Sequence, residues 1–172
     1  IVRWNETGDD ATALTFDWDI FLLAGQPSNA GTPNAPSDNI SADNLFNSPD
    51  GLAFDSFGRL WIQTDGNFSN TGNFANNGNN QMLAADPTTK EVRRFLVGPS
   101  GCEVTGITWT PDRRTMFVCI QHPGEMGSHP RRPAGYGDNE IARDPTAFST
   151  WPTAGIRPRS SVVVVRRTDG GV

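Results

Sequence analysis

Apolar and polar residues alternate in several short stretches of this chain. Residues 13–25 begin with such an alternation and end in a continuous apolar run. Because successive side chains of a β-strand point to opposite sides, this pattern predicts a strand with one apolar face. The residues on that face are Leu14, Phe16, Trp18 and Ile20.

Shorter runs of the same kind predict further strands between turn residues. These strands cover residues 52–55, 59–64, 81–85, 91–97, 104–109 and 115–121, and a β-branched strand lies in SSVVVV near the end. The connections DSFG, DPTTK and TPDRR suit turns between paired strands. The 18 glycines and 13 prolines also favour turns and loops over long helices.

Three long segments have the composition of loops. Residues 26–44 are rich in Pro, Asn, Ser and Asp, and residues 122–158 form an irregular insertion with many Pro and Gly. Residues 65–80 are rich in Gly and Asn. This third loop is either a flexible excursion on the surface or the border of a site, since long loops often carry function.

The strands repeat along the chain. Residues 51–97 hold four short strands in up-and-down order, and the pattern around Gly51 returns at Gly106, 55 residues later. Four strands in a repeat of roughly 40–50 residues are typical of a propeller blade. The predicted fold is therefore an all-β partial propeller of about three four-stranded antiparallel blades, not all complete, with long loop insertions. Its predicted parts are a blade remnant (1–44), a blade (45–100) and an incomplete blade with an insertion (101–172).

Propellers usually close with at least four blades. The chain has 172 residues, starts without Met at IVRWNETGDD and ends at RRTDGGV. We therefore expect it to be the C-terminal portion of a longer propeller. Its open strand edges would then pair with the remaining blades or with another copy of the chain.

The composition excludes some functions. The net charge is −5 and the pI is about 4.9, which disfavours general binding to the phosphate backbone of nucleic acids. No apolar run is long enough to span a bilayer, and the N-terminus does not have the pattern of a signal peptide. The sequence also lacks a phosphate-binding Gly-rich loop and a G-x-S-x-G nucleophile motif.

Two acids precede the first strands of the two repeats. Asp50 lies just before Gly51, and Glu103 lies three residues before Gly106. Inner strands of a propeller line its channel, so these carboxylates would converge and favour a cation such as calcium. In an alternative interpretation, Asp50 only belongs to a PDG turn in which Gly51 takes a positive φ. Glu103 stands among apolar neighbours and does not fit a turn as well.

Other polar residues are candidates for lining this site. They are Asn44, Asn47, Asp65 and His122. His122, Glu125 and His129 have a spacing that resembles a zinc motif, but Pro123 and Gly124 prevent the helix that would bring them together. Cys102 and Cys119 are expected to be small buried side chains rather than a disulfide.

The order of these motifs resembles one family. FDWDIFLLAG, FNSPDGLAFDSFGRLWIQTD, CEVTGITWTPDRRTMFVCIQHPGE and SSVVVVRRTDGGV together are similar to the C-terminal part of the PhoX-type bacterial alkaline phosphatases, over nearly the whole chain. The resemblance implies a propeller phosphomonoesterase that is periplasmic or secreted and that binds calcium and iron. It also implies that Asp50 and Glu103 are metal ligands on the channel side. Cys102 does not match the position of the cysteine that the family uses.

The resemblance sets the expectations for function. The longer protein is expected to be a metal-dependent hydrolase of phosphate esters, and this chain alone is expected to be inactive, without its metals. SPDGLAFDSFGRLWI is also similar to calcium-dependent propeller lactonases and gluconolactonases. A non-catalytic propeller that serves in binding is the third alternative.

Overall fold

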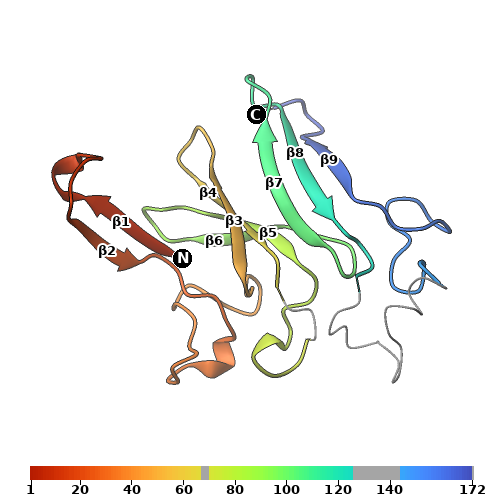
Figure 1. Ribbon diagram of the computed structural model, residues 1–172, viewed down its shortest axis with the longest axis horizontal. Helices are drawn as coiled ribbons and strands as arrows, with labels where there is room; N and C mark the ends of the chain where they lie inside the picture. Colours follow the sequence, from red (N-terminus) through yellow and green to blue (C-terminus); the bar gives the residue numbers. More distant parts are fainter. Residues whose placement is uncertain (67–69, 126–143, 172) are drawn as a thin grey trace.

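The computed structural model describes residues 1–66, 70–125 and 144–171, and these residues form three antiparallel sheets (Figure 1). The first sheet pairs β1 (Val2–Glu6) with β2 (Phe16–Ile20); the second contains β3 (Pro49–Phe54), β4 (Leu60–Thr64), β5 (Gln81–Ala85) and β6 (Val92–Val97); the third contains β7 (Glu103–Trp109), β8 (Thr115–Gln121) and β9 (Ser161–Arg166). Three single-turn 3-10 helices accompany them in the described part: η1 (Thr7–Asp9), η2 (Pro27–Asn29) and η3 (Gly72–Phe74). The prediction of an all-β partial propeller is confirmed.

Most predicted strands agree with the structure to within a few residues. β5 and β8 have the predicted bounds, while β3 begins three residues earlier than expected, at Pro49. The predicted strand at 13–25 is shorter in the structure, where β2 covers Phe16–Ile20. β1 was not predicted, although Val2 and Trp4 alternate with polar residues.

The middle sheet has an apolar layer on each face. On one face, Leu60 and Ile62 of β4 pack in a buried cluster with residues of the loop before β3, including Leu45 and Phe46. On the other face, Trp61 packs in a second cluster with residues of β7 and β8. All five residues of β4 are therefore buried. Two stacked sheets with a third layer of loop are the arrangement expected for neighbouring blades.

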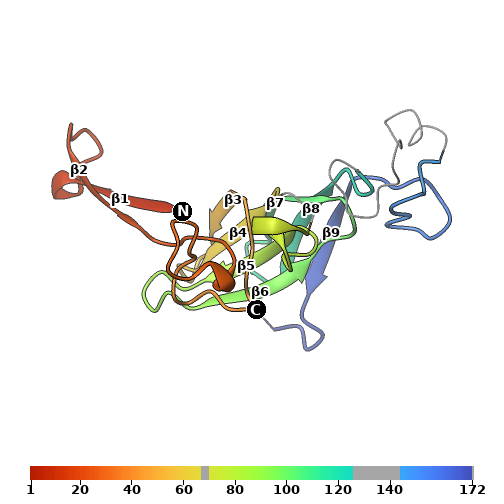
Figure 2. The same ribbon diagram turned by 90° about the horizontal axis from the view of Figure 1, so that it is seen from below.

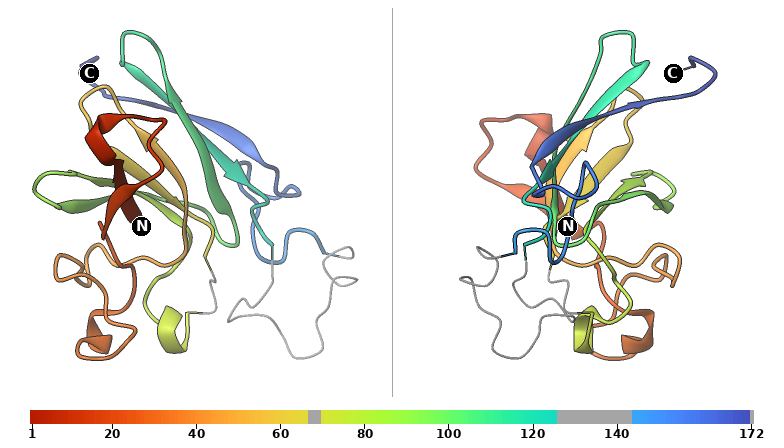
Figure 3. Two further views of the ribbon diagram at one scale, coloured as in Figure 1. Left: turned by 60° about the vertical axis from the view of Figure 1, so that its left-hand side comes forward. Right: turned by 90° about the vertical axis from the view of Figure 1, so that its right-hand side faces the viewer.

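The long loops and the tight turns lie at opposite ends of the sheets. Figures 1 and 3 show the loops after β2, β4 and β8 together at one end, with the β3–β4 and β7–β8 turns at the other. β3 and β7 both start at the loop end. Residues at the starts of β3 and β7 and at the ends of β4 and β8 therefore meet at that end.

The β1–β2 ribbon extends away from the other sheets, as Figure 2 shows. Its apolar side chains are exposed: Val2, Trp4, Leu14, Phe16, Trp18 and Ile20. The alternation thus gives a strand as predicted, but no described residue covers most of its apolar face. A small apolar groove of about 260 Å³ lies where the ribbon approaches β3.

Among the described residues, no helix has both the length and the apolar character that a membrane crossing requires. Both cysteines are free; Cys102 is buried as expected, whereas Cys119 is only partly buried.

Asp55 organises the turn between β3 and β4. Its carboxylate accepts hydrogen bonds from Trp61 Nε1 (3.0 Å), Arg59 Nε (2.8 Å) and the backbone amides of Phe57 and Arg59. Burial by itself would raise the pKa of Asp55, but the hydrogen bonds from Trp61 and from the Phe57 and Arg59 groups outweigh it and lower the pKa below its ordinary value.

We expect the replacement Asp55→Asn to lower the free energy of unfolding at pH 7 by about 1–3 kcal/mol. A carboxylate with a lowered pKa stabilises the fold above its unfolded-state pKa, and this stability is lost as the pH falls through the folded-state pKa. The difference between the two proteins should therefore shrink in acid, which urea unfolding from pH 7 down to about pH 3 measures. Asp43→Asn, at an exposed loop carboxylate, is the control. A difference that stays constant with pH would contradict this role of Asp55.

Candidate functional site

The first strands of the two larger sheets carry a bulge at matching places. The register of β3 against β4 shifts between Pro49 and Leu52, and the register of β7 against β8 shifts between Thr105 and Ile107. The two shifts include Gly51 and Gly106, the positions that the repeat predicts to be equivalent. Bulges bend a strand and redirect its side chains, and they are common beside sites.

Position 51 requires glycine because the side chain of Gln63 approaches it closely, and not because the chain turns there. A Cβ atom at this position would lie 2.4 Å from Oε1 of Gln63. Gln63 in turn donates from Nε2 to the carbonyl of Thr105 and so ties β4 to β7. Because Asp50 and Gly51 lie inside β3, the alternative interpretation of SPDG as an ordinary turn is wrong.

Asp65, Glu103 and His122 come together at the loop end of the sheets. Each of them offers a ligand atom, and these atoms lie within 4.8 Å of one another. Asp65 follows β4, Glu103 starts β7 and His122 follows β8, so two sheets contribute to the group. His122 Nε2 lies 3.5 Å from a carboxylate oxygen of Glu103.

The backbone and ring of His122 are held by neighbouring loops. Its amide donates to Oγ of Ser160 at 2.9 Å, and its Nδ1 lies 3.0 Å from a carboxylate oxygen of Glu125. His122 has a φ of +38°, in the left-handed region that side chains rarely adopt. Such conformations cluster at functional sites. His129, the third residue of the disfavoured zinc spacing, lies outside the described residues.

The pKa of Glu103 is raised above its ordinary value. Burial is the largest cause, since only 13% of the side chain is exposed, and the charges of Asp65 and Asp50 add to it. His122 acts in the opposite direction. Asp50 is exposed and lies outside the group of three, but it is close enough to act on Glu103. Negative charge is therefore in excess here, which favours a bound cation.

Asn80 joins the two loops that carry the acids. Its Oδ1 accepts from Gly66 N (2.7 Å) and Thr64 Oγ1 (2.9 Å), and its Nδ2 donates to the carbonyls of Cys102 (2.9 Å) and Gly66 (3.3 Å). These partners flank Asp65 and Glu103 in the chain. Asn80 was not among the predicted site residues, and its signal in the sequence was its place at the end of the Asn-rich loop, directly before β5. That loop does border the site.

The two candidate amides have different surroundings. The side chain of Asn47 lies against Gly66, where a Cβ atom would meet its Oδ1 at 1.8 Å. This Oδ1 is buried and has no hydrogen-bond partner among the described residues. Asn44 is bound elsewhere: its Nδ2 donates to the carbonyls of Asn39 (3.0 Å) and Val92 (2.9 Å), which fastens the preceding loop to β6. The structure therefore brings Asn47, and not Asn44, next to the loop of Asp65.

Cys102 belongs to the core. Its side chain is fully buried, and a Cβ atom on Gly98 would lie 2.3 Å from its Sγ. Burial, with a smaller contribution from Glu103, raises the pKa of Cys102 to about 12. Without a metal beside it, the thiol therefore stays protonated at neutral pH.

Comparisons with known proteins give one consistent result. The sequence profile of the family described as "Alkaline phosphatase PhoX" matches residues 1–124. A search of curated proteins found no match. Among solved structures, the chain is similar to Pseudomonas fluorescens PhoX in complex with vanadate, a transition state analogue, with a TM-score of 0.83 and 53% sequence identity. The match covers 99% of this chain and 27% of that one. The chain therefore belongs to the PhoX family of alkaline phosphatases.

Proposed function

We propose that a protein containing this chain hydrolyses phosphate monoesters, and that Asp65, Glu103 and His122, with Asp50 beside them, supply part of its metal centre. The observation that carries the proposal is the convergence of the first three residues from two sheets. The membership in the PhoX family supports the phosphatase activity. The chain spans only about a quarter of the PhoX structure that it matches, so further ligands would come from other segments of a longer protein.

The residues present fit a cation. Carboxylate and amide oxygens suit calcium, and an imidazole beside carboxylates suits iron, the two metals that the family resemblance implies. The buried Oδ1 of Asn47, next to the loop of Asp65, is an acceptor for which the described part of the chain supplies no donor. Bound metal would polarise the phosphoryl oxygens and stabilise the charge that develops in the transition state.

The side chains themselves have distinct roles in this proposal. Asp65 and Glu103 carry the negative charge that holds the cation, and without a cation this charge repels a phosphate ester. The contact between His122 Nδ1 and Glu125 fixes the imidazole ring, so that Nε2 stays directed at Glu103. Asp50 raises the local negative charge from β3.

We also propose how the blades are arranged in the longer protein and where that protein acts. Residues 1–44, 45–100 and 101–172 would belong to three successive blades. The exposed face of the β1–β2 ribbon would be covered by other blades or by a second copy of the chain. The protein would act in the periplasm or outside the cell, by analogy with its family, while the isolated 172-residue chain would be inactive.

Metal content and activity test the proposal together. In the longer protein, Glu103→Gln and Asp65→Asn are each expected to weaken metal binding by at least the roughly 10–100-fold that loss of a ligand's supporting partner costs, and to lower the hydrolysis of p-nitrophenyl phosphate. Asp112→Asn, at an exposed carboxylate of the β7–β8 turn on the opposite end of the sheets, is the matched control and should change neither.

The same experiment separates the alternatives. Iron together with phosphatase activity supports the proposal. Calcium with the opening of a simple lactone would instead support a lactonase, and a protein without metal or turnover would support a binding propeller. Unchanged metal content and phosphatase rate in both acid variants would refute the assignment of Asp65 and Glu103.

A further inference from the structure

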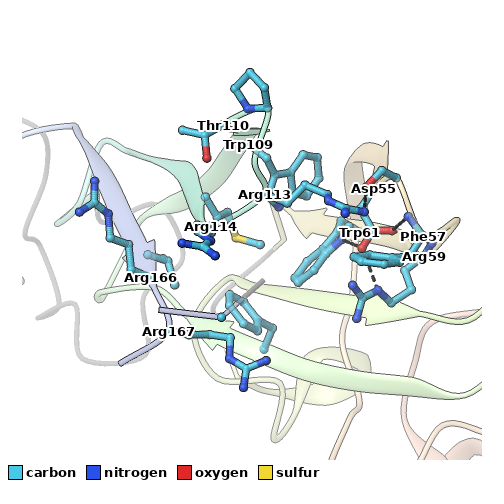
Figure 4. A pocket seen from close by; sticks show the side chains of 16 residues that line it. Asp55, Phe57, Arg59, Trp61, Trp109, Thr110, Arg113, Arg114, Arg166 and Arg167 are labelled. Carbon is cyan, nitrogen blue, oxygen red and sulfur yellow. Dashed lines mark hydrogen bonds and ion pairs between the residues drawn. The ribbon is translucent and has the colours of Figure 1, made fainter. Parts of the chain in front are cut away.

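A pocket of about 820 Å³ lies at the end of the sheets opposite to Glu103. Its walls come from the β3–β4 turn, the β7–β8 turn and the C-terminal end of β9 (Figure 4). β3 and β7 run from the candidate metal site towards this pocket, which is therefore a separate site on the same two sheets. Its volume is within the range of small-molecule sites.

The interior wall of the pocket is aromatic. The rings of Trp61 and Phe95 meet edge to face with their centroids 5.0 Å apart, and Trp109 lies 6.0 Å from Trp61. Phe95 is 46% exposed, although it is a large apolar side chain. These rings, with Met116 and Val165 beside them, offer a surface for a flat apolar group.

The rim of the pocket is strongly basic. Among the described residues that line it, five are arginines and Asp55 alone is a carboxylate: the arginines are Arg59, Arg113, Arg114, Arg166 and Arg167. Asp55 is engaged by Arg59 and Trp61, and Arg167 is paired with Asp169 at 2.6 Å. Positive charge therefore remains in excess at the rim.

Two arginines of the β7–β8 turn are the best placed to bind an anion. The guanidinium of Arg113 lies 4.5 Å from the centre of the Phe57 ring and donates to Ser56 Oγ at 3.2 Å. Its orientation is thus fixed while donors remain for a ligand. Arg114 is exposed, and the nearby Asp112, which accepts from Thr110 and from the amide of Arg114, offsets part of its charge.

We propose that this pocket binds a small aromatic phosphate, such as a nucleoside monophosphate. The ring of the ligand would pack on Phe95 and Trp109, and its phosphate would be held by Arg113 and Arg114, because guanidinium groups match the geometry of phosphate oxygens. This inference does not depend on the proposed phosphatase activity, since it uses none of the residues of the candidate metal site.

Tryptophan fluorescence of the 172-residue chain tests the proposal, because Trp61 and Trp109 line the pocket. The probe is the phosphonate analogue of adenosine monophosphate, whose carbon–phosphorus bond cannot be hydrolysed, and EDTA removes any metal from the other site. We expect this analogue to change the emission and to bind at least about tenfold more tightly than adenosine or inorganic phosphate alone, since each lacks half of the contacts.

Substitutions locate the ligand. The double variant Arg113→Gln/Arg114→Gln, at two exposed positions, should weaken binding by about tenfold or more. The control Arg93→Gln removes an exposed arginine of β6 outside the pocket and should leave binding unchanged. The proposal is overturned if the analogue does not bind at millimolar concentration, if phosphate alone binds as tightly, or if the double variant binds as well as the original chain.

Discussion

Replacing Phe46 by alanine is expected to lower the free energy of unfolding by about 3–5 kcal/mol, as is usual for a large buried side chain. Phe46 lies in a loop, yet none of its surface is exposed. It belongs to the same buried cluster as Leu22, Ile62 and Leu83, and its carbonyl accepts from the amide of Gly25 at 3.1 Å. Its removal would leave a cavity between the long loop and the middle sheet.

The matched control for this prediction is Phe54→Ala. Phe54 is the same residue type and lies on β3, but 65% of it is exposed. Its truncation should therefore cost about 1 kcal/mol or less. Urea unfolding of the two variants and the original chain gives the comparison. Equal effects at both positions would show that the loop does not form part of the core.

The strands could be predicted from the sequence because their signal is local. Alternation and turn residues depend on neighbours in the chain, and the predicted β5 and β8 agree with the structure. The role of the loop before β3 could not be predicted in this way. Its residues Ile40, Leu45 and Phe46 are buried only because the chain folds back on the middle sheet.

Alternation predicts a strand better than it predicts burial. The ribbon residues Phe16 and Trp18 alternate as a buried face would, but they are 58% and 64% exposed. Whether an apolar face is covered depends on what packs against it, and the pattern within one strand does not contain this information.

Part of the candidate site could be predicted from the sequence repeat. The equivalence of Gly51 and Gly106 led to Asp50 and Glu103, and the structure has a register shift at both glycines. Asp65 and His122 were named only as lining residues, yet the structure groups them with Glu103. Their closeness arises from the stacking of two sheets, which the sequence of either repeat alone does not encode. The role of these residues as ligands stays a prediction.

Replacing Asn80 by alanine is the second change from which we expect a large effect. The role of this residue could not be predicted from the sequence, because its partners lie in two separate loops. Asn80→Ala removes a 95% buried amide that makes four hydrogen bonds, and it leaves the amide of Gly66 and the carbonyl of Cys102 without their partner. Each buried polar group that loses its hydrogen-bond partner lowers the stability of the fold by about 1–3 kcal/mol. We therefore expect the free energy of unfolding to fall by about 2–4 kcal/mol.

The same replacement should also weaken cation binding, because Asn80 fixes the distance between the loops of Asp65 and Glu103. Calcium or iron affinity is measured in the longer protein, under conditions in which circular dichroism shows the variant to be folded, so that loss of position is separated from loss of fold. Asn73→Ala, an exposed amide in the same loop, is the control and should change stability by no more than about 0.5 kcal/mol. If the longer protein with Asn80→Ala is folded and binds cations as tightly as the longer protein without it, Asn80 supports the fold alone and does not position the site.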